Sequence, residues 1–173
     1  MRKHNGMRPQ DIVVLLKIIA LGKNSWQHKD LASTLKLSAS EVSESLNRSQ
    51  IAGLLDQTKK KVRKQSLMEF LQFGLHYVFP QIPGTMVNGI PTAHAHPFMQ
   101  QYFSTETPFV WASRNGNERG LSVEPLYPKQ LEAINADENL YKLLALIDVI
   151  RIGKLREKEI AILELKKIII HEQ

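Results

Sequence analysis

The densest group of cations in this 173-residue sequence lies in residues 57–64, QTKKKVRK. Lys59, Lys60, Lys61 and Arg63 stand so close together that their charges repel one another unless an anion lies nearby. Clustered lysine and arginine side chains supply the phosphate contacts of nucleic-acid-binding proteins. The cluster therefore predicts phosphate binding, and a solvated lysine-rich surface is the alternative.

Two histidines, His94 and His96, could lie on one face of a strand as metal ligands do, with His76 or Glu106 as a third ligand. The sequence has no H-E-x-x-H, G-x-S-x-G, P-loop or G-x-G-x-x-G motif. It also has no cysteine, which excludes disulfides and thiolate zinc sites. We therefore expect no catalytic activity, no metal and no cofactor. A hydrolase or nucleotide enzyme that uses the histidine segment is the alternative.

The cationic cluster follows residues 25–56, whose apolar spacing predicts two short helices separated by a turn. The apolar positions are Leu31, Leu35, Val42 and Leu46. Ser38 begins the S-x-x-E pattern of a capping box, which predicts that the second helix spans residues 38–52. His28 and Lys29 fall at the start of the first helix, where the positive end of the helix dipole could face a phosphate.

Further elements are predicted on both sides of this pair. A core helix precedes it from Pro9 until Gly22. Residues 54–56 and 62–64 have the composition of two short strands around a turn, and a hairpin in this place is a wing. Ser66 begins a second S-x-x-E pattern, which predicts a broadly apolar helix up to Pro80.

The second half of the chain has a different pattern. Residues 81–109 are rich in Pro, Gly and Thr and predict irregular structure. Residues 108–113 and 121–126 have strand composition and flank Asn-Gly-Asn, which predicts a β-hairpin. Residues 137–152 and 155–170 have helical periodicity, and the last helix suits dimerisation.

The pattern L-A-x-x-L-x-L-S-x-S-x-V-S-x-x-L at residues 31–46, followed by A-G-L-L at residues 52–55, resembles the helix-turn-helix of bacterial winged-helix regulators, especially the MarR-like group. With the preceding helix and the wing, the resemblance covers about a third of the chain. It implies a dimeric repressor that reads two half-sites roughly one helical turn apart.

The resemblance also assigns roles to individual residues. The second helix would enter the major groove with Ser40, Ser43, Glu44, Asn47 and Arg48 as its exposed side chains. Asn47 would pair with adenine, Arg48 with guanine or phosphate, and Glu44 with a cytosine amino group. The DNA backbone would be held by His28, Lys29, Ser38, Lys59, Lys60, Lys61 and Arg63.

Positive charge is concentrated in the first half of the chain. Residues 1–80 hold 13 Lys/Arg against 6 Asp/Glu, whereas residues 81–173 hold 10 against 11. This asymmetry predicts that the first half meets a polyanion. We therefore expect a mainly α (α+β) protein with a winged helix-turn-helix DNA-binding domain and its following helix in residues 1–80, and a dimerisation or partner-binding region in residues 81–173.

The expected function is that of a sequence-specific double-stranded DNA-binding transcriptional regulator, a homodimer that represses its own operon. The alternative is a protein-interaction or antitoxin-like module that neutralises or scaffolds a partner encoded nearby, with DNA binding secondary. The longest apolar run, residues 12–21, is interrupted by Lys17 and is too short to cross a bilayer. Without a signal-peptide cleavage site either, the expected location is the cytoplasm, with no membrane partner.

Overall fold

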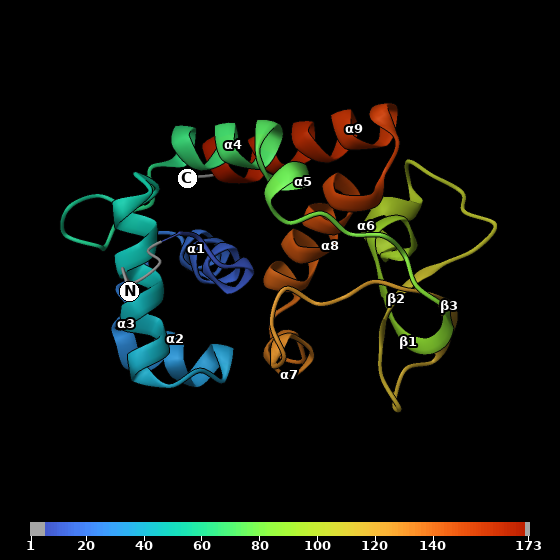
Figure 1. Ribbon diagram of the computed structural model, residues 1–173, viewed down its shortest axis with the longest axis horizontal. Helices are drawn as coiled ribbons and strands as arrows, with labels where there is room; N and C mark the ends of the chain where they lie inside the picture. The colour runs from blue at the N-terminus through green and yellow to red at the C-terminus, as the bar shows by residue number, and fades with distance from the viewer. Residues whose placement is uncertain (1–5, 172–173) are drawn as a thin grey trace.

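A computed structural model describes residues 6–171, which form a mainly helical α+β fold with one small sheet (Figure 1). The first half contains α1 (Pro9–Leu21), α2 (His28–Leu35), α3 (Ala39–Ile51), α4 (Lys64–Phe73) and α5 (Leu75–Val78). The second half contains β1 (Met86–Thr92), the 3₁₀ turn η1 (Ala93–Ala95), α6 (Pro97–Gln100), β2 (Phe109–Ala112), β3 (Glu118–Ser122), α7 (Gln130–Ile134), α8 (Glu138–Ile152), α9 (Leu155–Lys166) and the π-helical turn η2 (Lys167–His171).

Helix α1 lies in the middle of the fold, between α3 and α8 (Figure 1). Five consecutive residues, Ile12 to Leu16 in the sequence IVVLL, are fully buried, so the helix is surrounded by protein on all sides. Helix α8 is buried in the same way from Leu143 to Ile150. The buried side chains of both halves of the chain form one continuous hydrophobic core, with α1 and α8 at its centre.

The predicted helices of the first half are confirmed up to the end of α3, but the segment after it differs. The predicted strands at 54–56 and 62–64 reduce to one antiparallel bridge between Leu55 and Val62. A second strand has no room, because α4 begins at Lys64. The expected cap at Ser66 is also wrong: the first bond of α4 runs from Leu67 N to Arg63 O, at 2.9 Å.

The sheet corrects two predictions about the second half. Strand β1 lies in the segment predicted to be irregular, and it pairs antiparallel with both other strands. Strands β2 and β3 pair with each other in parallel, at Phe109–Leu121, and therefore do not form the predicted hairpin. Gly89 makes this arrangement possible because it pairs with β2 and β3 at once, and a Cβ atom there would lie 2.1 Å from the carbonyl oxygen of Trp111.

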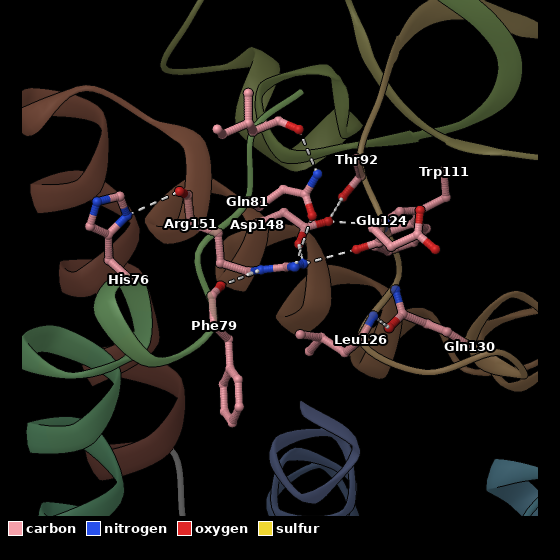
Figure 2. Close-up of polar contacts among 11 residues, drawn as sticks. His76, Phe79, Gln81, Thr92, Trp111, Glu124, Leu126, Gln130, Asp148 and Arg151 are labelled. Atoms are coloured by element: carbon pink, nitrogen blue, oxygen red, sulfur yellow. Dashed lines mark hydrogen bonds and ion pairs between the residues drawn. The ribbon is translucent and has the colours of Figure 1, made fainter. Parts of the chain in front are cut away.

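Figure 2 shows a buried polar network that fastens the sheet and two loops to α8. The Asp148 carboxylate accepts hydrogen bonds from Thr92 Oγ1 at 2.8 Å and from Trp111 Nε1 at 2.7 Å. It also forms an ion pair with Arg151 at 2.8 Å. The Arg151 guanidinium donates in addition to the backbone carbonyl oxygens of Phe79 and Glu124. All three nitrogens of the Arg151 guanidinium and both carboxylate oxygens of Asp148 have partners inside the fold, so the network ties α8 to the sheet and the loops.

The two C-terminal helices are confirmed, with boundaries close to those predicted. Asp137 caps α8 through a bond from Leu140 N to its Oδ1 at 2.9 Å. Gly153 ends α8, and α9 packs back against it. Within residues 6–171, no helix combines the length and the apolar character that a membrane span requires.

Candidate nucleic-acid interface

The start of α3 is fixed by a reciprocal capping box, as the sequence predicts. Ser38 Oγ accepts from Glu41 N at 3.1 Å, and Glu41 Oε2 accepts from Ser38 N at 2.8 Å. The hydrogen bond from the Ser38 backbone, followed by that with its side chain, lowers the pKa of Glu41. Ser38 is exposed, but its hydroxyl oxygen already accepts the capping hydrogen bond. It could therefore contact a DNA phosphate only by donating its O–H while it keeps the cap.

The residues assigned to the reading face of α3 differ in exposure. Ser40 and Asn47 are exposed, and Ser43 and Glu44 are half-buried. Ser40 and Asn47 are therefore more accessible to a partner molecule than Ser43 and Glu44. Arg48 lies one turn after Glu44, at the edge of this face, but its side chain is buried.

Arg48 corrects the prediction that it is an exposed, base-reading residue. Its guanidinium holds the fully buried carboxylate of Asp11 on α1 with two hydrogen bonds, Nε–Oδ2 at 2.9 Å and Nη2–Oδ1 at 2.7 Å. Ser45 Oγ donates a third bond to Asp11, at 2.7 Å. Arg48 therefore ties α3 to α1. The signal for this pair was present in the sequence as a single carboxylate in the first turn of α1, a helix whose only other charged residue is Lys17.

The basic loop, residues 56–63, is folded around the side chain of Asp56. Its Oδ1 accepts from the backbone N–H groups of Lys60 and Lys61, at 3.0 and 3.1 Å. Its Oδ2 accepts from Thr58 Oγ1 at 2.6 Å, and this bond is the largest cause that lowers the pKa of Asp56. Lys59 adopts a left-handed conformation with φ +58°, which closes the turn. A single carboxylate thus holds a loop with four cationic side chains.

The cations of the basic loop have different neighbours. Lys59 Nζ donates to Asn47 Oδ1 on α3. Lys60 Nζ lies 4.3 Å from the centre of the Trp26 ring and donates to the Trp26 carbonyl oxygen at 3.2 Å. Lys61 and Arg63 are exposed and form no salt bridge with any residue of the described range 6–171.

The start of α2 is linked to the basic loop through Trp26. His28 and Lys29 are both exposed on the first turn of α2, and the His28 ring stacks on Trp26 with centroids 6.4 Å apart. Because Lys60 also contacts Trp26, the start of α2 and the basic loop lie close together. The structure thus brings together most of the predicted phosphate-binding residues, and Trp26 is the contact that sequence reasoning did not assign to them.

His94 and His96 do not lie on a strand. His94 is in the turn η1, where its Nε2 lies 2.8 Å from Glu157 Oε2 on α9. His96 caps α6 by accepting from Phe98 N at 3.1 Å, and its ring packs edge-on against Tyr141 at 4.2 Å. Burial, followed by the charge of Lys142, lowers the pKa of His96 to about 4.

No three His, Asp or Glu side chains within residues 6–171 are grouped so that they could hold a metal ion. The exposed edge of α3, the basic loop and the start of α2 form the candidate interface, because Lys59 contacts Asn47 and Lys60 contacts Trp26. No protein-family model, no curated protein and no solved structure matches this chain.

Proposed function

We propose that this protein is a sequence-specific double-stranded DNA-binding regulator that acts as a homodimer and represses transcription of its own operon. The observation that carries the proposal is the contact between Lys59 Nζ and Asn47 Oδ1. It joins the basic loop to the exposed edge of α3, so that a phosphate-binding group and a base-reading group lie on the same surface.

The chemistry of this surface suits duplex DNA. The Asn47 side chain has one acceptor and two donors, the pattern that pairs with the N6 and N7 edge of adenine. Lys61 and Arg63 are exposed and form no salt bridge within the described range, so they are available for phosphates. Glu44 is half-buried near Arg48, at 3.6 Å, and can accept a hydrogen bond from a cytosine amino group.

The test begins with selection of a binding site from random duplexes, followed by measurement of Kd against salt concentration. The variant Lys61→Gln, Arg63→Gln should flatten the salt dependence by about two units per protomer if each side chain contacts one phosphate. The matched control is Arg114→Gln, Arg119→Gln. It removes the same charge from two exposed arginines at the sheet, and its slope should equal that of the native protein.

Two outcomes would contradict the proposal. The first is a selection that yields no preferred duplex. The second is a salt dependence that the basic-loop variant and the sheet variant change to the same extent, because binding would then follow net charge alone. Asn47→Ala adds a separate measurement: it should reduce discrimination between the selected site and random DNA by about 1–3 kcal/mol.

A second candidate function, a protein-interaction module, is favoured by one observation. Apolar side chains in segment 73–82 face solvent: Phe73, Tyr77 and Ile82 are 67%, 80% and 86% exposed. Large exposed apolar side chains gathered in one segment mark interaction surfaces. The partner would be a protein encoded by a neighbouring gene.

Sedimentation of the native protein and of the variant Tyr77→Asp, Ile82→Asp separates these functions. In the homodimeric regulator, the variant becomes monomeric and loses DNA affinity. If the protein is an interaction module, the variant no longer binds the co-expressed product of the neighbouring gene but keeps the DNA affinity of the native protein. A variant with unchanged mass, partner binding and DNA affinity would show that segment 73–82 takes part in neither function.

A further inference from the structure

A pocket of about 350 Å³ lies behind the basic loop, between α1, α4 and the C-terminal turn η2. Four lysines line it: Lys23 after α1, Lys60 and Lys61 in the basic loop, and Lys64 at the start of α4. Its remaining wall is apolar and includes Trp26, Ile19, Val62 and Ile168. The volume falls within the range of about 300–1,000 Å³ that small-molecule sites occupy.

Positive charge predominates in this pocket. Among residues 6–171 no carboxylate lines it, and the ammonium groups of Lys23, Lys61 and Lys64 form no salt bridge in that range. The acidic side chain of the basic loop, Asp56, does not line the pocket; it is bound to backbone N–H groups of the loop, and its pKa is lowered most by the hydrogen bond from Thr58 and least by the charge of Lys61. Four like charges around one hollow repel one another, so an anion of more than one charge is the ligand that relieves the repulsion.

The apolar wall defines the other part of the ligand. Trp26 is half-buried and lines the hollow together with Ile19, Val62 and Ile168. A hydrated inorganic ion gains nothing from such a surface, whereas an apolar body buried against it is stabilised by about 25 cal/mol per Å². Lys60 strengthens the combination because its ammonium already lies over the Trp26 ring and can hold an anionic group beside that ring.

We propose that this pocket binds a small organic phosphate: a phosphoryl or diphosphoryl group among the four lysines, attached to an aromatic or branched apolar body against Trp26 and the aliphatic wall. The site requires residues from α1, the basic loop, α4 and η2, which are far apart in the sequence and meet only in the folded chain. The proposal concerns a small-molecule site and does not depend on whether the protein binds DNA.

The test uses 1-naphthyl phosphate as the probe, with 1-naphthol and inorganic phosphate as its two parts. Trp26 is one of only two tryptophans in the chain, and the other, Trp111, is fully buried. Titration should therefore change the fluorescence of Trp26, measured as the difference from the same titration of Trp26→Phe, which records the emission of the probe itself. Calorimetry should give a Kd for 1-naphthyl phosphate at least about tenfold below the values for 1-naphthol and for inorganic phosphate, because only the intact probe uses both parts of the pocket.

Variants assign the binding to the pocket. Lys23→Gln and Lys64→Gln should each raise the Kd for 1-naphthyl phosphate by about tenfold, the effect of losing one charge-assisted hydrogen bond. Ile168→Glu places a carboxylate among the lysines and should abolish binding, while circular dichroism confirms that the variant is folded. The control is Lys129→Gln, which changes an exposed lysine just before α7 that does not line this pocket; this variant should bind the probe as the native protein does.

Three results would overturn the proposal. Equal affinity for 1-naphthyl phosphate and inorganic phosphate would mean that the apolar wall contributes nothing. Equal affinity for 1-naphthyl phosphate and 1-naphthol would mean that the lysines contribute nothing. Equal effects of Lys64→Gln and Lys129→Gln would mean that the probe binds by net charge alone. Each result is obtained without DNA and therefore leaves the proposed function unaffected.

Discussion

The ion pair between Asp11 and Arg48 gives the sharpest test of how α3 is held. The Asp11 side chain is completely buried and the Arg48 side chain is 9% exposed. Replacing Arg48 by Met keeps an unbranched apolar stem but leaves the Asp11 carboxylate buried with only Ser45 as a side-chain donor. Removal of one partner from a buried pair costs about 3–5 kcal/mol, because the remaining charge loses its compensation.

Urea unfolding measures this loss as a decrease in the free energy of unfolding. In thermal unfolding, for a chain of this size, a loss of about 3–5 kcal/mol corresponds to a decrease in Tm of roughly 6–20 °C. Glu44→Gln is the matched control. Glu44 contacts the same guanidinium at 3.6 Å but is about half exposed, so its loss should change stability by no more than about 0.5 kcal/mol.

A double-mutant cycle separates the pair from its surroundings. Asp11→Asn combined with Arg48→Met removes both charges, so the double variant should be less destabilised than the sum of the two single variants, by at least about 1 kcal/mol. An Arg48→Met protein with native stability and weakened DNA discrimination would refute the reasoning. Arg48 would then be a base-reading residue, as its position in the sequence pattern had predicted.

Three further predictions concern the second half of the chain. Burial lowers the pKa of His96 to about 4, below its ordinary value of 6.5, so between these pH values the unfolded chain binds more protons than the folded one. The free energy of unfolding therefore falls by up to about 3 kcal/mol as the pH falls from 7 to 4. Urea unfolding of His96→Asn should show a smaller fall, and an equal fall would contradict the assignment. Arg151→Met should destabilise by about 3–5 kcal/mol in thermal unfolding because Asp148 loses its partner, and Asp148→Asn in the same chain should recover part of the loss. Gly89→Ala should cost at least about 1–3 kcal/mol and alter the near-ultraviolet dichroism of Trp111, whose carbonyl oxygen the new Cβ would meet; an unchanged spectrum would contradict the close approach.

The helices are the part of the fold that the sequence predicts well, because their signals are local. Apolar periodicity and the capping box at Ser38 define α3 within a few residues of its observed ends. The cap expected at Ser66 fails for a physical reason. The helix begins at Lys64, so Ser66 lies inside its first turn and not before it. Burial of Leu67, Met68 and Leu71 against the core stabilises the first turns of α4 by more than one capping hydroxyl would.

The sheet was not predictable from composition, because its pairing depends on contacts between distant residues. Asn115, Gly116 and Asn117 have the composition of a hairpin turn, but β1 takes the antiparallel position next to both strands. Gly89 of β1 pairs with both β2 and β3, and the close approach there leaves no room for a Cβ atom, so the glycine has to stand at this point of the register. The tie between Asp11 and Arg48 is missed for a similar reason: residue type alone does not distinguish a cation that meets phosphate from one that meets a carboxylate 37 positions away.

The internal use of Arg48 limits how the proposed DNA surface can read sequence. Asn47 remains as the exposed side chain on α3 with a bidentate donor and acceptor pattern, and one good bidentate contact discriminates by about 1–3 kcal/mol. Two protomers would then supply about 2–6 kcal/mol, against the 4–10 kcal/mol by which specific sites usually exceed random DNA. The remainder has to come from Ser40, Ser43 and Glu44 or from the shape of the DNA between the half-sites. Since Lys59 already binds Asn47 Oδ1, reading adenine also requires that this oxygen share its second lone pair or release the lysine to a phosphate. The basic loop and α3 would therefore engage DNA together.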